Sequence, residues 1–261
     1  MRRQPKGMIC PKCRYEQDDN NQECPRCGII FQKYNARHQT RPAMQTPPRV
    51  IQDQSDPEDS EGILSIINQL LFYVPDEVNA IAFWGRTFLL AGLFAWGWVF
   101  ILTPVASNAA GSSFMHLVNL PFHEAGHLVF KPFGRIMHSL GGTLGQILMP
   151  LICMTVLVVK TRDTFGGAVG LWWAGQNFID IAPYINDARS LSLPLLGGNT
   201  GRTSPYGFHD WEFILKELHL IRYDHFIAGL SHKTGAAVML LASAWGLYIL
   251  LKQYRRLRGV S

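Results

Sequence analysis

The feature that most constrains this chain is a long stretch without charge, residues 87–105 (TFLLAGLFAWGWVFILTPV). Its nineteen residues include no Lys, Arg, Asp or Glu, and a helix needs about 20 predominantly apolar residues to cross the hydrocarbon core of a bilayer. Further apolar runs occupy residues 111–130, 143–159, 165–185 and 234–251. A soluble protein with a large helical core is the alternative, but five separate runs low in charge favour lipid. The sequence therefore predicts an α-helical, polytopic membrane protein with about five spans.

Four of the five cysteines lie in two CxxC pairs, Cys10-Pro-Lys-Cys13 and Cys24-Pro-Arg-Cys27. Each CxxC turn brings two thiolates to one side of a tight loop, and two such turns complete a tetrahedral zinc site. Residues 7–34 are too few to bury a core, so a structural zinc ion would supply the folding free energy. Two disulfides are the alternative, and they need an oxidising compartment. The segment resembles the zinc-ribbon family, which implies a module that binds a protein partner or acts as a cap.

The rest of the chain divides by composition. Residues 35–62 are rich in Pro, Gln, Asp and Ser, which predicts a flexible linker. Residues 63–80 begin with an apolar stretch too short to span, which predicts an interfacial or packing helix. Residues 81–261 form the membrane-embedded domain. The net charge of +5 is spread over short connections, so it does not indicate a nucleic-acid partner.

The basic connections leave the topology open. Reduced thiolates place the cysteine segment in the cytoplasm, and Lys131 and Arg135 fit a cytoplasmic loop. Strict alternation of five spans then puts the basic tail, residues 252–258, outside, against the positive-inside tendency. Either one apolar run is re-entrant, or the stretch 63–74 inserts as well.

The second apolar run contains His123-Glu124-Ala125-Gly126-His127. Residues i and i+4 share a face of a helix, so His123 and His127 can present two imidazoles to one catalytic zinc ion. Glu124 is placed to take a proton from a metal-bound water. Ionisable side chains at membrane depth are costly, so this motif indicates a function rather than an accident of packing.

A third zinc ligand is expected in GQNFIDIAPYINDARS, two apolar runs later. Asp180 and Asp187 are seven residues apart, so both can face one side of a helix. Pro183 weakens the helix between them and can free backbone carbonyls. Alternatively, one aspartate caps the helix and the other pairs with Arg189.

One further segment and one further histidine are expected to have structural roles. GFHDWEF contains His209, Asp210 and Glu212, which could approach the metal or bind substrate. The commoner outcome for this sequence is a capped amphipathic helix. His138 is expected in a loop beyond the histidine helix, as a solvated or capping residue.

Residues 85–190 resemble the site-2 protease family of intramembrane zinc metalloproteases. The resemblance implies that His123, His127 and Asp187 are the metal ligands. It implies that Glu124 is the general base, and that Asn177, Pro183 and Gly142 support the site or the substrate. Ala188 follows Asp187 where the family usually has glycine, and the spacing from Asn177 is longer than usual. Asp180 therefore remains an alternative third ligand.

The resemblance implies a protease that cuts membrane-bound regulatory proteins, with one catalytic and one structural zinc ion. The cysteine segment would then be a cytoplasmic adaptor that binds a protein partner. A non-proteolytic metal-binding or adaptor protein on the same scaffold is the alternative, favoured by the altered aspartate motif. A cation transporter fits less well, because no matching second polar span is present. Short loops are typical of a bacterial inner membrane protein.

Overall fold

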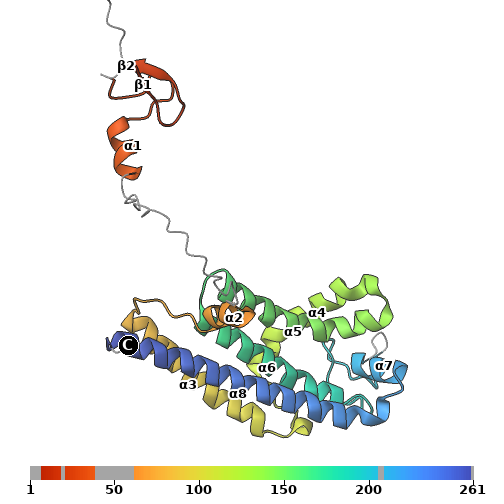
Figure 1. The fold of residues 1–261 in the computed structure, drawn as a ribbon. Helices are drawn as coiled ribbons and strands as arrows, with labels where there is room; N and C mark the ends of the chain where they lie inside the picture. Colours follow the sequence, from red (N-terminus) through yellow and green to blue (C-terminus); the bar gives the residue numbers. More distant parts are fainter. Residues whose placement is uncertain (1–6, 19–20, 39–61, 205–208, 260–261) are drawn as a thin grey trace, which may run out of the picture. The chain divides into compact units, whose positions relative to one another are not determined.

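In the computed structural model the chain forms two units, residues 1–58 and 59–261. The structure describes residues 7–18, 21–38, 62–204 and 209–259 (Figure 1). Most of the linker predicted at residues 35–62 lies outside the described residues. Its first four residues belong to a helix that begins at Phe31.

The first unit is a small hairpin followed by a helix. Strands β1 (Gly7–Ile9) and β2 (Glu16–Asp18) pair in antiparallel register, with Met8 opposite Gln17. The first CxxC turn connects the two strands, the second follows them, and α1 (Phe31–His38) completes the unit. Its described residues, 7–18 and 21–38, are too few for a substantial apolar core.

The second unit consists of helices in the part of the chain that the structure describes. In chain order they are α2 (Ile63–Leu71), α3 (Ala80–Leu102), η1 (Val105–Ser107), α4 (Phe114–Phe130), η2 (Lys131–Phe133), α5 (Arg135–Val159), α6 (Thr164–Asn186), α7 (Asp210–Glu217), η3 (Ile221–Tyr223) and α8 (Asp224–Leu257).

Helix α6 lies at the centre of this bundle, in contact with α5, α8 and α3. Most of its residues are buried, and small residues let its neighbours approach closely. A Cβ on Gly235 of α8 would lie 2.5 Å from the carbonyl oxygen of Gly175 in α6. The pair α4 and α5 uses the same device, because a Cβ on Gly145 would lie 2.3 Å from the carbonyl oxygen of Phe122. Glycine at these positions allows backbone-to-backbone contact between the helices.

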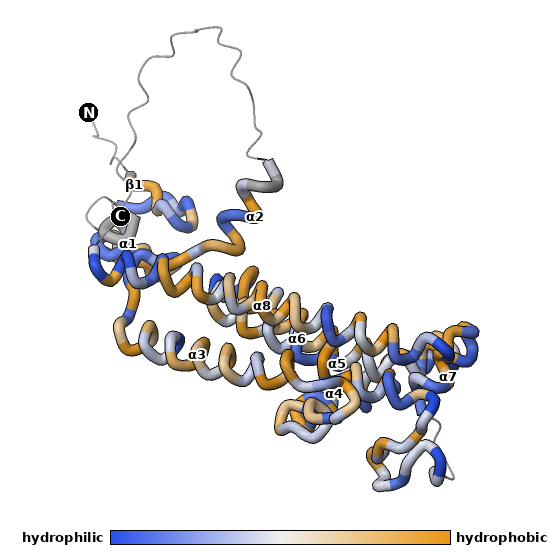
Figure 2. Tube along the Cα trace, turned by 90° about the horizontal axis from the view of Figure 1, so that it is seen from below, coloured by the Kyte–Doolittle hydropathy of each residue, from blue (hydrophilic) through white to orange (hydrophobic). Residues whose placement is uncertain are grey.

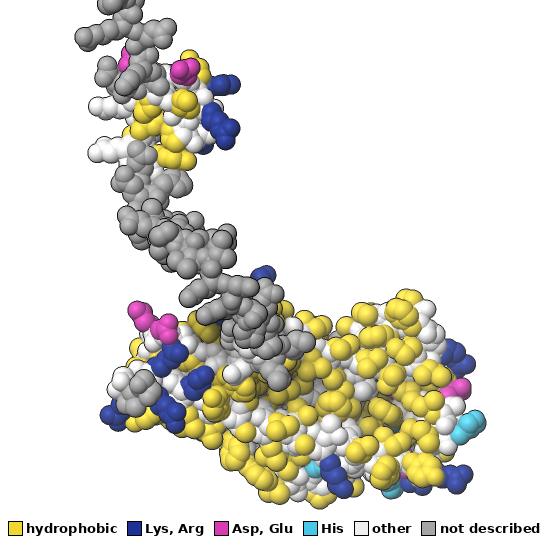
Figure 3. All heavy atoms as spheres, in the orientation of Figure 1, with side chains coloured by type: hydrophobic (Ala, Val, Ile, Leu, Met, Phe, Trp, Pro, Cys, Tyr) yellow, Lys and Arg dark blue, Asp and Glu magenta, His cyan; other side chains and the backbone are white. Residues whose placement is uncertain are grey.

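Three of the predicted apolar runs form helices long and apolar enough to cross a membrane: α3, α5 and the segment Ile221–Leu257 that contains α8. Large apolar side chains point outward from them, such as Ile81 at 85% exposed and Phe88 at 74%. Hydrophobic residues follow the middle of α3 and α8 (Figure 2) and cover much of the visible face of the bundle (Figure 3). The structure therefore supports a lipid environment.

The other two predicted spans are not confirmed. Helix α4 has 17 residues, fewer than the usual spanning length. Helix α6 is not among the three membrane-crossing candidates, although it has 23 residues. Its buried polar residues, including Gln176 and Asn177, reduce its mean hydropathy.

Polar contacts tie several segments together at one end of the bundle. Arg86 near the start of α3 pairs with Asp163 after α5, at 3.2 Å. The hydroxyl of Thr164 at the start of α6 donates to the carbonyl oxygen of Tyr73. Lys252 near the end of α8 donates to the carbonyl oxygen of Phe72. The start of α3, the end of α5 and the end of α8 therefore share this end.

Candidate functional site

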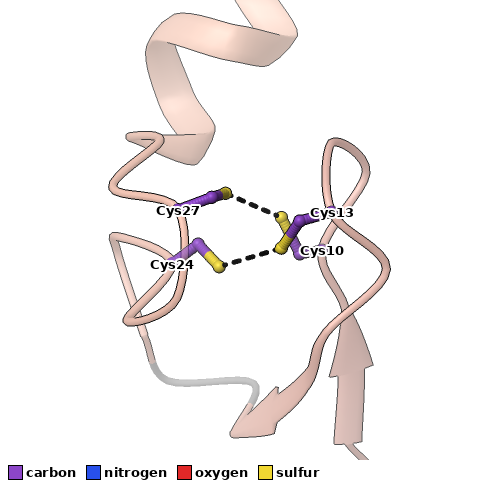
Figure 4. A group of neighbouring side chains, drawn as sticks. All are labelled: Cys10, Cys13, Cys24 and Cys27. Atoms are coloured by element: carbon purple, nitrogen blue, oxygen red, sulfur yellow. Dashed lines mark hydrogen bonds between the residues drawn. The ribbon is translucent and has the colours of Figure 1, made fainter.

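The four cysteines of the first unit form a compact group (Figure 4). Sγ of Cys10 lies 3.7 Å from Sγ of Cys27, and Sγ of Cys13 lies 3.7 Å from Sγ of Cys24. A disulfide has an S–S distance of about 2.05 Å, so these thiols are not paired covalently. A tetrahedral ion with bonds of about 2.3 Å to sulfur sets its ligands about 3.8 Å apart. The group therefore fits a structural metal ion.

The two CxxC turns have the same backbone geometry. The N–H of Cys10 donates to the carbonyl oxygen of Tyr15, and Arg14 donates back to the carbonyl oxygen of Cys10. In the second turn, Cys24 N–H donates to Ile29 and Gly28 N–H donates to Cys24. The residue after each second cysteine has a positive φ, +57° at Arg14 and +68° at Gly28. These equivalent turns direct the four thiols to one point.

A second group that could hold a metal ion consists of His123, His127 and Asp210. Nε2 of His127 lies 3.4 Å from Oδ2 of Asp210, and Nε2 of His123 lies 3.7 Å from the same oxygen. Nitrogen and oxygen ligands at about 2.0–2.1 Å from a tetrahedral ion are about 3.4 Å apart. The two nitrogen–oxygen separations therefore fit one ion bound between these residues.

The other ring nitrogen of each histidine is held by α5. Nδ1 of His123 lies 2.8 Å from Oε1 of Gln146, and Nδ1 of His127 lies 2.7 Å from the carbonyl oxygen of His138. Because both partners are acceptors, each Nδ1 carries a proton, which leaves each Nε2 as the ring atom available to an ion. His138 also donates from Nδ1 to the carbonyl oxygen of His127. It lies in α5, not in a loop as the sequence suggests.

Gly142 of α5 lies directly against the two imidazoles. A Cβ there would lie 2.5 Å from Nε2 of His123 and 2.6 Å from Nε2 of His127. Gly126, inside the His123–His127 motif, meets α5 just as closely, since its Cβ would lie 2.0 Å from the carbonyl oxygen of Gly141. These two glycines allow α5 to support the histidine helix by direct backbone contact.

Asp210 reaches the histidines because it is the first residue of α7. The preceding residue, His209, caps this helix, since its Nδ1 accepts from the N–H of Glu212 at 3.3 Å. The ring of His209 lies 3.9 Å, centroid to centroid, from the ring of Tyr184 in α6. The hydroxyl of Tyr184 accepts from the N–H of Asp210 at 3.3 Å. Tyr184 and His209 therefore fix the start of α7 against α6.

The Asp210 carboxyl is ionised at neutral pH. Burial acts to raise its pKa, but the imidazoles of His123 and His127 beside it outweigh burial and lower the pKa to about 2. The charged form is the one that binds a metal ion.

Asp187, the third ligand expected from the sequence, lies at the end of α6 outside this group. It accepts from the N–H and hydroxyl of Ser192 at 3.0 and 2.8 Å, and from the N–H of Leu193 at 2.9 Å. Its Oδ2 is also 3.6 Å from Nε2 of His209. In this structure the carboxylate holds the segment after α6, next to the capping residue of α7.

Asp180, the alternative ligand, is buried in contact with α4. It accepts from Asn119 at 2.9 Å and lies 3.1 Å from Nδ1 of His116. Asn177 and Pro183 are buried within α6, where the amide of Asn177 donates to the carbonyl oxygen of Trp173. These residues contribute to the packing of α6 and are not part of the group formed by His123, His127 and Asp210.

Glu124 follows His123 on α4 and is half-buried. Within the described parts of the chain, no hydrogen bond or ion pair occupies its carboxylate. A free carboxylate beside the histidines could accept a proton from a group bound there.

Of the residues near this group, sequence reasoning singled out both histidines, Glu124 and Gly142, and it weighed the Asp210 segment and His138 as structural. It gave no role to Gln146 or Tyr184. The sequence His-Asp-Trp at residues 209–211 could have indicated Asp210, because an acidic residue directly after a helix cap projects from the start of the helix.

No protein-family model, no curated protein and no solved structure matches this chain. The interpretation of its function therefore depends on its own residues and their geometry.

Proposed function

We propose that the chain is an intramembrane zinc metalloprotease that hydrolyses peptide bonds of membrane proteins, with its catalytic zinc held by His123, His127 and Asp210. The observation that carries the proposal is the convergence of two Nε2 atoms and one carboxylate oxygen at 3.4 and 3.7 Å. Two imidazoles and one carboxylate make up a common catalytic zinc site, whose fourth position stays open. A bound zinc ion would supply a Lewis acid and lower the pKa of a coordinated water.

The chain's own residues would do the rest of the chemistry. Glu124 would accept a proton from the attacking water and pass it to the leaving amine. Gln146 and His138 would hold the imidazoles in the tautomer that presents Nε2. A site that only stored metal would not need a free carboxylate beside its ligands, and Glu124 therefore favours hydrolysis.

The four cysteines would hold a second, structural zinc ion, and their unit would bind a protein partner. We place the protein in a cell membrane, such as a bacterial inner membrane, with this unit in the cytoplasm. The start of α3 and the end of α5 share one end of the bundle. If α3 and α5 each cross the membrane once, the chain between them lies on the opposite side. Helix α4 would then enter the membrane from that side and return to it, as a re-entrant segment.

The test uses full-length protein purified in detergent, with its zinc content measured by atomic emission. Wild type should hold two ions, and His123→Ala and Asp210→Ala should each hold one. Asp180→Asn, which removes a buried carboxylate outside the group, should keep two. Retention of both ions by Asp210→Ala would contradict the assignment of the third ligand.

Proteolysis is tested separately, by counting new peptide termini in membranes that contain wild type or Glu124→Gln. Wild type should generate termini within membrane proteins, whereas Glu124→Gln should keep both zinc ions and generate none. If the zinc results are as expected but wild type cuts nothing, the chain is a non-proteolytic metal-binding protein on this scaffold.

A further inference from the structure

A pocket of about 650 Å³ lies at the end of the bundle where α8 finishes. Its walls come from α2, the segment between α2 and α3, the turn between α5 and α6, and the last turns of α8. None of the residues of the metal-binding group lines it. The pocket therefore needs an explanation independent of the proposed protease site.

Three cationic side chains face this pocket, Arg162, Lys252 and Arg256, against one carboxylate, Asp76. Arg256 pairs with Asp76, whose side chain is 98% exposed. Positive charge is therefore in excess by two in the pocket. Lys and Arg side chains also gather over this end of the bundle in Figure 3.

These cations keep donors free for a ligand. Arg162 lies with its guanidinium carbon 5.8 Å from the centre of the Tyr73 ring, and it has no hydrogen bond to the described parts of the chain. Lys252 uses one donor on the carbonyl oxygen of Phe72, at 2.8 Å. An arginine offers five N–H donors and a lysine three, so most remain available. Asn68 and Gln69 of α2 add polar side chains to the same wall.

Exposed aromatic residues lie at the same end of the bundle, on α3 and α8. Tyr248 packs edge-on against Phe72 with 5.2 Å between ring centres, and Tyr254 lies 6.0 Å from Phe83. Both tyrosines and Trp84 are more than two-fifths exposed. Tyr and Trp concentrate where membrane helices meet the headgroup region. Aromatic residues at this end of the bundle are those expected at the headgroup level.

We propose that this pocket binds the phosphodiester group of an anionic phospholipid. Its excess positive charge selects an anion, its guanidinium groups match phosphate oxygens, and its place among interfacial aromatics favours a lipid over a soluble phosphate. Basic pockets between helices at a membrane surface bind anionic headgroups for these reasons.

Native mass spectrometry of the full-length protein, titrated with phosphatidylglycerol or phosphatidylcholine, tests the proposal. Phosphatidylglycerol should bind at least about tenfold more tightly than phosphatidylcholine. Arg162→Gln/Arg256→Gln should weaken phosphatidylglycerol binding about tenfold or more. Lys131→Gln/Arg222→Gln, which removes the same charge from exposed sites elsewhere, should stay within about twofold of wild type. If the pocket variant is unstable in a thermal melt, the single variant Arg162→Gln replaces it. Its affinity for phosphatidylglycerol should fall at least about threefold.

Three results would overturn the proposal. Equal binding of the two lipids would remove the selection for an anion. Equal losses in the pocket and control variants would indicate a general effect of charge. Displacement of the lipid by inorganic phosphate at equal concentration would indicate a site for a soluble phosphate.

Discussion

The imidazole of His123 in α4 rests on the backbone of Gly142 in α5. A Cβ on Gly142 would lie 2.5 Å from Nε2 of His123, the atom that faces Asp210. Real Cβ atoms do not approach other atoms so closely, and the same methyl group would also meet Nε2 of His127 at 2.6 Å. The absence of a side chain at this one position therefore leaves space around both Nε2 atoms.

Gly142→Ala should abolish metal binding at the histidine group. The added methyl group would displace both imidazoles, and the protein should retain one zinc ion, at the cysteines. Zinc content of the purified protein measures the loss. Gly92→Ala in α3 is the matched control, because a Cβ there meets no atom within 4 Å, and it should keep two ions. Two ions in Gly142→Ala would show that the imidazoles can bind zinc in another position.

The sequence was sufficient for the parts of this site that depend on local geometry. His123 and His127 are one helical turn apart, and each CxxC pair forms a single turn, so spacing alone predicts that their side chains converge. The third member of the histidine group could not be found this way. Asp187 and Asp210 both follow polar interruptions of apolar sequence, and which one reaches α4 depends on how α7 folds back over α6.

The predicted count of five spans was not confirmed, for a related reason. Hydropathy reports only the composition of a segment. By length and composition, α3, α5 and the segment that contains α8 are able to cross a membrane. The run at residues 165–185 was counted as a span because it is long and low in charge, but its buried polar residues lower its mean hydropathy, and as α6 it is enclosed by its neighbours. Helix α4 carries the histidine motif in 17 residues supported by close glycine contacts with α5, and its length could not be read from the apolar run.

Gln146→Leu should weaken zinc binding at the histidine group by about 10–100-fold, because Nδ1 of His123 would lose its acceptor and the ring its orientation. Competition with a chromogenic chelator measures the affinity. Gln146→Glu keeps an acceptor oxygen and should bind at least as tightly as wild type. A similar loss in both variants would indicate a packing role for Gln146 instead.

Asp187→Asn should destabilise the second unit by about 1–3 kcal/mol at neutral pH, because the charged acceptor of Ser192 and Leu193 is lost. A thermal melt in detergent measures the change. Glu217→Gln, an exposed acid on α7, should have no effect. An unchanged melting temperature for Asp187→Asn would mean that the segment after α6 is held by other contacts.

The same carboxylate predicts a pH dependence. Burial acts to raise the pKa of Asp187, but hydrogen bonds from Ser190, Ser192 and Leu193 outweigh it and lower the pKa below its ordinary value. A lowered pKa contributes stability above the unfolded value of about 3.9, and this stability is lost as the pH falls through the folded pKa. Between about pH 5 and pH 3, wild type should therefore lose more stability than Asp187→Asn. Parallel losses would assign the acid sensitivity to other groups.

Arg14→Gly should tighten zinc binding by the cysteines, and Gly28→Ala should weaken it. Both positions have a positive φ, which costs a residue with a Cβ about 1 kcal/mol relative to glycine. Gly28 has space for a methyl group, whose nearest neighbour would be Glu23 at 3.7 Å, so backbone strain alone should decide the result. Because zinc binding and folding are coupled in so small a unit, each change should alter the apparent affinity about fivefold. The measurement is zinc transfer to a chelator in the His123→Ala background, where only the cysteine-bound ion is expected. Changes in the same direction for both variants would show that the two turns do not share the conformational constraint that their backbone geometry indicates.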